Sequence, residues 1–440
     1  MASVTDIGYR PSSFKKALAE VAFAYEQVPF FAGHLDEAGI GLADVRTADD
    51  FRRIPTTQKI DYRRNFPQGV LARGKTLRDP LTLKSQSSGT GGERLTTITH
   101  TYALAERMRA TLLANKVLGE ALARCRSHRP IRYAAPNCSD VECATPFTTI
   151  QDRTLPDGTL VLPVSHDVLA TPDQLVQQAI DETEEFDPHW FYADATHLAF
   201  LVRQLKARGL KPPQVSAVAL TYTLVTGVAR RQLQEFFGAD MPMAEIVSMT
   251  ELGWVAIECP AGRMHVNNQT FFAEFLVDGR PAGPGERAEL VATSLGDRIS
   301  PHLRYRTGDI YSLGEQPCVC GSDLPQATHE GRLTTMIKVV KDGAPALISP
   351  RDVDRAVGAD LPIDVYQLRQ PASGEMEFRY IPSAGARVDE KALRERLLDM
   401  LGTTTSLAIE SVTYIPAART GKFASCVSEV TQPASNGGEQ

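Results

Sequence analysis

The sequence lacks any apolar run that approaches the roughly 20 residues a membrane-spanning helix requires, so we expect no membrane partner. Its beginning, MASVTDIGYRPSSFKK, contains no apolar signal core, which predicts a cytoplasmic location. Basic residues are outnumbered, with 47 Lys and Arg against 53 Asp and Glu, so no nucleic acid partner is expected. Cysteine is also scarce. Seven cysteines, an odd number, favour thiols or metal ligands over a disulfide framework.

What is present is the composition of an ordinary globular protein. Hydrophobic residues make up 42% and charged residues 23%, which excludes collagen-like, low-complexity and wholly disordered chains. The length of 440 residues exceeds what one hydrophobic core usually organises, so we predict at least two domains.

The first half of the chain alternates helical and strand-like patterns. Helical spacing of apolar residues predicts helices over 13–28, 102–124, 170–184 and 196–207, the second as one long helix. Thr171 before Pro172 predicts the start of the third helix, with threonine as the N-cap. Strand-like runs at 159–164 and 215–220 lie between helices, and this alternation indicates an α/β architecture.

The pattern changes near residue 264. Short strand-like runs between Gly and Pro turns predict a small antiparallel or barrel-like unit over 264–330. Residues 331–430 read as a compact α+β stretch with a helix at 392–401, and the tail 431–440 is expected to be disordered. We therefore expect a large, multi-subdomain N-terminal α/β domain (1–330) and a small C-terminal α+β domain (331–430).

A glycine-rich loop is the most informative segment, with the sequence KSQSSGTGGER over residues 84–94. Its backbone N–H groups and hydroxyls suit the binding of an anion such as phosphate. It is not a Walker loop, because the G-x-x-x-x-G-K-[ST] spacing is absent. The alternative to an anion-binding loop is a flexible surface loop. The residues predicted to contact phosphate are Ser87, Ser88, Gly89, Thr90, Gly91 and Gly92.

A second group of residues suggests a metal-binding site. Cys259, His265, Cys318 and Cys320 supply three thiols and one imidazole, a donor set that suits tetrahedral zinc with no position left open for substrate. Independent buried thiols are the alternative, since cysteine also packs as a small hydrophobe. The remaining cysteines show no such grouping and are interpreted as buried or incidental thiols: Cys125, Cys138, Cys143 and Cys426.

Several further motifs follow the glycine-rich loop in order. They are Met-Thr-Glu at 249–251, YRTGD at 305–309, Gly-Arg at 331–332 and RTGK at 419–422. Together with FRRIPTTQKIDYRRNFPQGVLA at 51–72, the set resembles the adenylate-forming superfamily, in its phenylacetate–CoA ligase-like branch. The resemblance covers roughly residues 50–425, and YRTGD and TGK are its most specific parts.

The resemblance implies ATP-dependent adenylation of a carboxylic acid, with the glycine-rich loop on the β- and γ-phosphates. Glu251 would bind Mg²⁺, and Thr250 would touch the α-phosphate. The alternative for this Thr-Glu pair is a helix N-cap with an acidic first turn.

The nucleoside would lie on a second group of residues. Asp309 resembles the aspartate that accepts hydrogen bonds from the ribose hydroxyls, and Arg332 resembles the arginine that approaches the same sugar. Tyr222 is a candidate for stacking on adenine. An ion pair between Arg306 and Asp309 that stabilises a turn is the alternative for YRTGD.

Lys422 is the main catalytic candidate, because a flexible ammonium could stabilise charge where carboxylate and phosphate meet. An ordinary exposed lysine is the alternative. The resemblance implies a mobile C-terminal domain that rotates after adenylation to admit a thiol. The usual hinge aspartate is replaced by Thr334.

The resemblance implies an aryl or other compact acid as substrate and CoA as acyl acceptor. Alternatives are an amine, a carrier-protein thiol or nitrite as acceptor, or a regulatory protein that binds nucleotide without catalysis. Trp190 to Tyr192 and His197 could line an apolar slot, but the spacing favours core positions. Asp140 and Glu142 could meet an amino or hydroxyl group, although loop acids near the Arg-rich stretch 122–132 are favoured. A homodimer is possible on general grounds.

Overall fold

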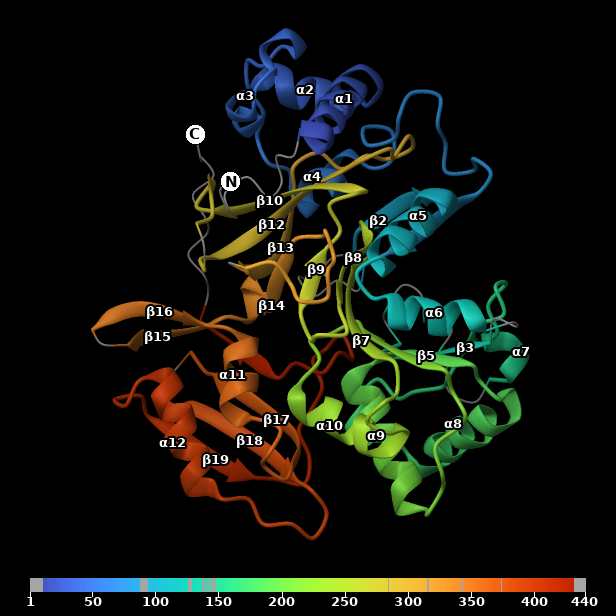
Figure 1. Cartoon of the computed structure of the whole chain (residues 1–440), viewed down its shortest axis with the longest axis vertical. Coiled ribbons are helices and arrows are strands. Elements are labelled where there is room, and N and C mark those ends of the chain that lie inside the picture. The colour runs from blue at the N-terminus through green and yellow to red at the C-terminus, as the bar shows by residue number, and fades with distance from the viewer. Residues whose placement is uncertain are drawn as a thin grey trace. The chain divides into compact units, whose positions relative to one another are not determined.

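The computed structural model describes residues 11–87, 94–125, 129–136, 138, 141, 144, 148–283, 285–314, 316–341, 343–372 and 374–430. The fold is mixed α/β (Figure 1). The chain divides into two compact units. Unit 1 contains Met1–Ala123, Cys138–Asp140 and Ala244–His329, and unit 2 contains Arg124–Asn137, Val141–Met243 and Glu330–Gln440. Within the described ranges, no helix has the length and apolar character needed to cross a bilayer.

Unit 1 begins with helices that pack on the hydrophobic face of its strands. Val21, Phe31 and Phe51 lie in one buried core with Phe272 and Leu290. Pro29 both ends the first helix and begins the second, at a position where its missing N–H costs nothing. The helices are α1 (Pro11–Gln27), α2 (Pro29–Glu37), the 3₁₀ turn η2 (Leu42–Asp44), α3 (Ala48–Arg53), α4 (Lys59–Asn65), α5 (Thr101–Leu112) and α6 (Lys116–Arg124).

The strands of unit 1 are mainly antiparallel, as predicted after residue 264. They run in the order β11, β10, β12, β13, β14, β9, β8, β7, and among the described residues they form an open sheet rather than a closed barrel. A separate hairpin joins β1 (Thr82–Gln86) to β2 (Thr96–His100). The others are β7 (Met243–Met249), β8 (Gly253–Glu258), β9 (Met264–Val266), β10 (Phe271–Val277), β11 (Arg280–Pro281), β12 (Arg287–Ser294), β13 (Tyr305–Leu313) and β14 (Gln326–Arg332).

Unit 2 contains a parallel sheet with helices that follow its strands. β3 pairs with both β4 and β5, and β5 pairs with β6, in each case parallel. These strands are β3 (Pro130–Tyr133), β4 (Leu160–Val161), β5 (Trp190–Asp194) and β6 (Ala217–Thr221). The accompanying helices are α7 (Ile150–Arg153), η3 (Val168–Ala170), α8 (Asp173–Phe186), α9 (Ala195–Ala207) and α10 (Gly227–Phe237).

The C-terminal part of unit 2 is α+β and packs on α10. Val228 of α10 joins the buried core of this part, and Arg231 donates to the carbonyls of Ala359 and Ile363. Its elements are η4 (Leu333–Thr335), β15 (Ile337–Lys341), β16 (Ala344–Ile348), α11 (Pro350–Val357), β17 (Ile363–Gln370), β18 (Met376–Pro382), α12 (Glu390–Leu401), β19 (Leu407–Ser411) and β20 (Cys426–Ser428). The predicted tail 431–440 lies outside the described residues.

The prediction of one long helix over 102–124 is wrong. The helix breaks after Leu112, and α6 starts at Lys116. Asn115 accounts for the break: its Oδ1 accepts from the Leu118 backbone N–H at 2.9 Å, and its Nδ2 donates to the Glu258 carbonyl at 2.7 Å. Asparagine side chains compete with helical hydrogen bonds in this way, whereas the apolar periodicity continues across the break.

The predicted start of the helix at 170–184 also needs correction. Pro172 is the N-cap of α8, and Thr171 instead ends the preceding 3₁₀ turn, where its hydroxyl donates to the Val168 carbonyl at 2.8 Å. The error is one residue, within the usual uncertainty of a helix end.

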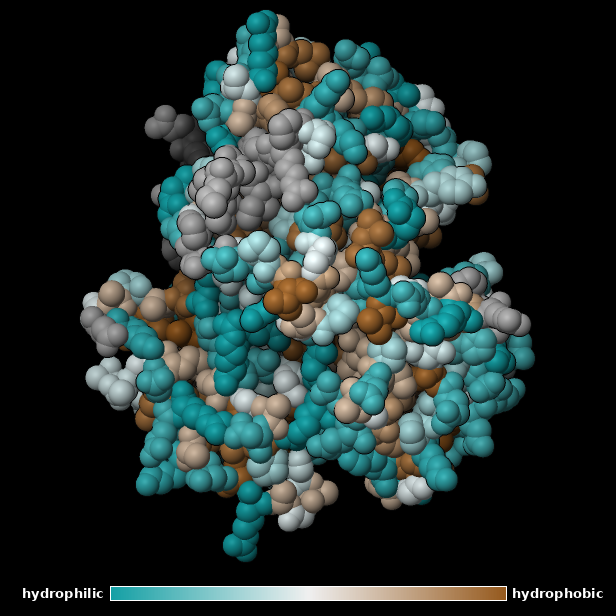
Figure 2. Space-filling view, viewed as in Figure 1, coloured by the Kyte–Doolittle hydropathy of each residue, from teal (hydrophilic) through white to brown (hydrophobic). Residues whose placement is uncertain are grey.

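Figure 2 shows hydrophilic residues over most of the visible face, with hydrophobic residues in small separate groups. Scattered surface hydrophobic residues of this kind are normal for a globular protein.

Candidate functional site

Glu251 lies in the tight turn between the antiparallel strands β7 and β8, in unit 1. The turn is followed by Gly253 at φ +73°, a left-handed conformation that favours glycine. No helix begins here, so the alternative of a helix N-cap is wrong for Thr250 and Glu251. The Thr250 carbonyl accepts from Thr97 Oγ1 at 3.3 Å, which ties this turn to β2.

The Glu251 carboxylate is only 7% exposed and contacts two polar groups through Oε1. Lys59 Nζ lies 3.6 Å away, and the Tyr305 hydroxyl donates at 3.3 Å. Lys59 comes from the segment 51–72 that carried part of the family resemblance, but sequence reasoning assigned it no role. The structure therefore surrounds this carboxylate with one cation and one hydroxyl from distant parts of the chain.

Asp309 lies on β13 and is almost fully buried. The alternative that it pairs with Arg306 is not supported, because the Arg306 guanidinium pairs with Glu289 at 2.6 Å. His329 Nε2 lies 3.9 Å from Asp309 Oδ1, and its Nδ1 lies 3.8 Å from Glu245 Oε1. Burial alone disfavours the charged ring, but these two carboxylates outweigh it and raise the pKa of His329 to about 8.

This His329 geometry predicts a pH dependence of stability. The folded-state pKa of about 8 exceeds the ordinary value near 6.5, so the charged ring stabilises the fold fully below pH 6.5. The contribution, about 2 kcal/mol, is lost as the pH rises through 8. We expect the difference in unfolding free energy between wild type and His329→Gln to shrink between pH 6 and pH 9. Urea unfolding at both pH values measures it, and a difference independent of pH would contradict this assignment.

The predicted phosphate loop lies between the two strands of the β1–β2 hairpin. Ser88, Gly89, Thr90, Gly91 and Gly92 lie outside the described residues. Ser87 is described and closes the base of the loop: its backbone N–H donates to the Leu95 carbonyl at 2.8 Å, and its Oγ accepts from the Leu95 N–H at 2.9 Å. The ends of the loop are thus held together by a hairpin stem.

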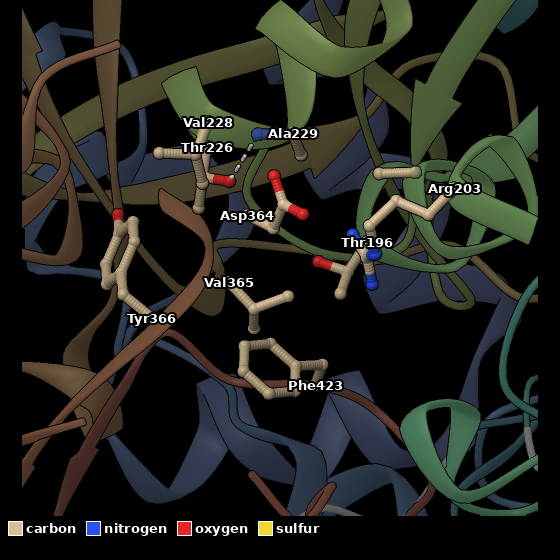
Figure 3. A pocket seen from close by; sticks show the side chains of 10 residues that line it. Thr196, Arg203, Thr226, Val228, Ala229, Asp364, Val365, Tyr366 and Phe423 are labelled. Atoms are coloured by element: carbon tan, nitrogen blue, oxygen red, sulfur yellow. Dashed lines mark hydrogen bonds between the residues drawn. The ribbon is translucent and has the colours of Figure 1, made fainter. Parts of the chain in front are cut away.

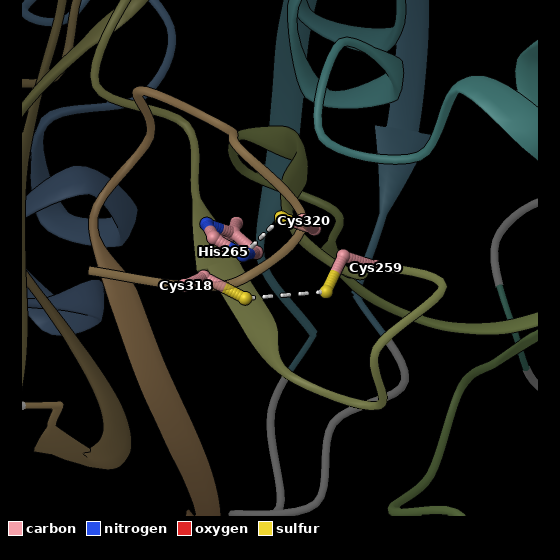
Figure 4. A group of neighbouring side chains, drawn as sticks. All are labelled: Cys259, His265, Cys318 and Cys320. Carbon is pink, nitrogen blue, oxygen red and sulfur yellow. Dashed lines mark hydrogen bonds between the residues drawn. The ribbon is translucent and has the colours of Figure 1, made fainter. Parts of the chain in front are cut away.

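The four predicted zinc ligands come together in unit 1 (Figure 4). The ligand atoms of Cys259, His265, Cys318 and Cys320 all lie within 4.8 Å of one another. Sγ of Cys259 and Cys318 are 3.7 Å apart, and Cys320 Sγ lies 3.3 Å from His265 Nε2. Three thiols and an imidazole nitrogen at this spacing fit one tetrahedral ion.

The surroundings of the cluster orient its ligands. His265 Nδ1 lies 2.8 Å from the Leu324 carbonyl, which fixes the proton on Nδ1 and leaves Nε2 facing the thiols. Gly321 adopts φ +72°, so the chain can turn directly after Cys320. Of the remaining cysteines, Cys125, Cys138 and Cys426 are buried and apart from the cluster, as predicted, and Cys143 lies outside the described residues.

Lys422 lies in unit 2 and reaches the turn that follows β6. Its Nζ donates to the Tyr222 carbonyl at 3.3 Å. Tyr222 has φ +73°, a strained conformation for a tyrosine, and backbone strain of this kind concentrates at functional sites. The Tyr222 ring packs edge-on against Tyr192, with ring centroids 5.6 Å apart.

The loop that carries Lys422 is clamped by the segment before η3. His166 Nε2 lies 2.9 Å from the Arg419 carbonyl. Asp167 caps η3 through Oδ1, and its Oδ2 accepts from the Ala417 N–H at 3.1 Å and from the Tyr414 hydroxyl. Sequence reasoning missed this clamp, since nothing local links residues about 250 positions apart.

Removal of the Asp167 carboxylate is expected to loosen this loop. We predict that Asp167→Ala lowers the free energy of unfolding by about 1–3 kcal/mol, as expected for the loss of hydrogen bonds to a charged group, and that Asp173→Ala has little effect. The matched control is Asp173→Ala, an exposed acid on α8 that pairs with Arg208. Urea unfolding compares both variants with wild type, and an unchanged unfolding free energy for Asp167→Ala would show that these hydrogen bonds do not hold the loop.

A small cavity lies beside the same loop, lined by α9, α10 and β17 (Figure 3). Phe423 projects into it next to Val365, and both belong to a small apolar cluster with Ile415. The residue after Lys422 is therefore anchored by packing. Arg332, at the end of β14, is exposed, and its carbonyl accepts from Thr335 Oγ1 at 2.8 Å.

Two of the three aromatic residues of β5 are buried core residues. Phe191 is buried against Phe237, and Tyr192 is buried between Trp190 and Tyr222. His197 is fully buried beside Asp194. Asp140 and Glu142 lie outside the described residues.

Comparison with known proteins supports the resemblance. No family model matches the chain. The phenylacetate–coenzyme A ligase of Thermus thermophilus is 29% identical over 315 residues, which cover 68% of this chain and 65% of that enzyme. The phenylacetate–coenzyme A ligase of Escherichia coli is 25% identical over 305 residues, or 66% of this chain and 64% of that enzyme. The chain thus aligns with just under two thirds of the length of these relatives.

A solved structure extends the fold comparison over almost the whole chain. 2-Hydroxyisobutyryl-CoA ligase, in a postadenylation state with an acyl-adenylate, superposes with a TM-score of 0.70. The match covers 94% of this chain and 88% of that one at 16% sequence identity. At this identity the match shows the fold alone. The predicted fold class and the resemblance to the phenylacetate–CoA ligase-like branch are both confirmed.

Proposed function

We propose that this chain, which has the adenylate-forming fold and resembles the phenylacetate–CoA ligases, activates a carboxylic acid with ATP. The products of this step would be an acyl-AMP and pyrophosphate, and the acyl group would then pass to the thiol of CoA. The observation that carries the proposal is the clamped position of Lys422 on the strained turn at Tyr222, at the carboxyl end of β6. Ligands of open α/β sheets bind at that edge.

The reaction brings two anions together. A carboxylate oxygen forms a bond to the α-phosphorus of ATP, and the bond from that phosphorus to the pyrophosphate oxygen breaks. An ammonium aimed at the developing negative charge lowers the barrier, because it interacts more strongly with the transition state than with the separated anions. Lys422 supplies this group in our proposal.

Glu251 suits a magnesium ion bound to the phosphates. It offers hard carboxylate oxygens in a buried turn, and its neighbours Lys59 and Tyr305 both contact Oε1. When bound, Mg²⁺ would neutralise phosphate charge. Thr250, which adjoins Glu251, would approach the α-phosphate, and the loop that starts at Ser87 would hold the outer phosphates.

The nucleoside would bind to Asp309 and Arg332, with adenine beside Tyr222. Asp309 lies 3.9 Å from His329, and a carboxylate accepts hydrogen bonds, as the two ribose hydroxyls would require. The second assignment, zinc bound by Cys259, His265, Cys318 and Cys320, is structural in our proposal, because all four tetrahedral positions would be filled by the protein.

The hinge position bears on the identity of the acyl acceptor. Thr334 stands where related enzymes carry the hinge aspartate, and it is exposed in η4. That departure favours a second candidate, in which the acyl-AMP is delivered to an amine, a carrier-protein thiol or nitrite. Both candidates share the adenylation step.

ATP–pyrophosphate exchange across a panel of aryl, amino-aryl and short aliphatic acids tests the proposed function. We expect one class of acid to support exchange, and CoA then to give a thioester detectable by mass spectrometry. Exchange without any thioester would favour the second candidate. Binding of ATP without exchange for any acid would favour the regulatory alternative and contradict the proposal.

A further inference from the structure

A buried polar network lies at the carboxyl edge of the parallel sheet in unit 2. Asp194 is the last residue of β5, and Thr223 follows β6 by two residues. Tyr133 ends β3, the neighbouring strand on the other side of β5. In open α/β sheets, this is the edge at which ligands bind.

Asp194 is the centre of the network, with 1% of its surface exposed. Its Oδ1 caps α9 by accepting from the N–H groups of Thr196 and His197, at 2.9 and 3.1 Å. Its Oδ2 accepts from Thr223 Oγ1 at 2.5 Å.

The carboxylate determines the state of the His197 ring. Nδ1 lies 2.9 Å from Asp194 Oδ1, and since a carboxylate only accepts, Nδ1 carries the proton. In the neutral ring Nε2 is then a hydrogen-bond acceptor. This is the tautomer that an Asp–His pair fixes in enzyme sites, where the second nitrogen acts on a substrate.

His197 Nε2 has no partner among the residues that the structure describes, although the whole side chain is buried. The imidazole ring packs perpendicular to the ring of Tyr133, with centroids 6.0 Å apart and planes at 86°. The capping of α9 requires only the Asp194 carboxylate. The packing of the His197 ring against its neighbours does not require a nitrogen atom at the Nε2 position. A buried acceptor without a partner is therefore unexplained by the fold alone.

The network adjoins the turn that Lys422 reaches. Lys422 donates to the carbonyl of Tyr222, and the next residue, Thr223, donates to Asp194. Lys422 and the histidine network thus contact consecutive residues of one turn. In our proposed function, Lys422 also meets the carboxylate of the acid. A compact acid with its carboxylate at Lys422 would extend along the same edge of the sheet.

We propose that His197 Nε2 accepts a hydrogen bond from a hydroxyl or amino group on the acid, and that the substrate is therefore a compact carboxylic acid with such a group. The inference rests on the proposed adenylation function and deepens it. A site built to bind a hydrogen-bond donor discriminates strongly against an analogue that lacks the donor, because the buried acceptor then stays unpaired.

The test compares matched acids in ATP–pyrophosphate exchange: benzoate with its hydroxy and amino derivatives, and isobutyrate with 2-hydroxyisobutyrate. We expect wild type to prefer a donor-bearing acid at least about tenfold in kcat/KM. His197→Phe should abolish the preference by raising KM for that acid, with little change for the unsubstituted partner. His197→Gln, which retains a polar atom, should restore part of it.

Controls separate this inference from the function on which it rests. His189→Phe changes a histidine at the opposite end of β5, beside Arg129, and should leave the preference intact. Exchange by wild type without any preference for donor-bearing acids would overturn the inference while leaving adenylation intact. Equal losses for all acids in His197→Phe would indicate a structural role and overturn it as well.

A measurement on the unmodified protein covers the case in which His197→Phe does not fold. In protein labelled with ¹⁵N-histidine, the preferred donor-bearing acid should shift the Nε2 resonance of His197, and its unsubstituted partner should not. The same shift with both acids, or no shift with either, would overturn the inference.

Discussion

Lys422→Ala is expected to lower the rate of acid-dependent ATP–pyrophosphate exchange by about 10²–10³-fold, the usual effect of removing one group that stabilises transition-state charge. The affinity for ATP should change little, because the other proposed nucleotide contacts come from elsewhere in the chain. Initial exchange rates at several ATP concentrations and saturating acid separate the two effects: kcat should fall and the apparent KM for ATP should not rise.

The matched control is Lys391→Ala, a highly exposed lysine of α12 in the same unit. It should leave exchange unchanged. Thermal unfolding of both variants should match wild type, because Lys422 contributes one contact of 3.3 Å to a backbone carbonyl. Unchanged exchange in a folded Lys422→Ala protein would remove this lysine from the mechanism.

Loss of the proposed metal is expected to have the largest effect on stability. Purified protein should contain one zinc per chain, and Cys320→Ala should reduce the zinc content to near zero. Since metal binding contributes directly to folding, we expect a loss on the order of 5 kcal/mol. That corresponds to a fall of about 10–20 °C in the unfolding temperature of a unit of this size.

Elemental analysis and thermal scans check this prediction, with Cys125→Ala as the control. Cys125 is buried but lies outside the cluster, so its replacement should leave the zinc content unchanged. Wild-type protein that is folded and free of zinc, and that is not stabilised by added zinc, would contradict a structural metal site.

Local patterns were sufficient to predict several of the elements. The apolar spacing at 13–28 and 196–207 matches α1 and α9, and the runs after 264 match β10, β12 and β13. The spacing of Cys259, His265, Cys318 and Cys320 was enough to suggest a cluster, because four donors of compatible chemistry are rarely coincidental. The structure brings these four residues together.

Contacts between distant segments could not be predicted from the sequence. Asn115 breaks a periodic helix because Glu258, 143 residues later, offers its carbonyl. Asp167 clamps a loop 250 residues away. His329 titrates near pH 8 only because β7 and β13 supply two carboxylates. In each case the side chain is ordinary in its local sequence, and its role depends on a partner that only the fold supplies.

The transfer of an oxygen atom from the acid to AMP is the direct signature of the proposed adenylation step. An acid that supports exchange is labelled with ¹⁸O in its carboxylate and incubated with ATP and the acceptor. Because a carboxylate oxygen attacks the α-phosphorus and stays there when the acyl group leaves, we expect AMP with one ¹⁸O atom and unlabelled pyrophosphate. Unlabelled AMP, or the formation of ADP and phosphate in its place, would contradict it.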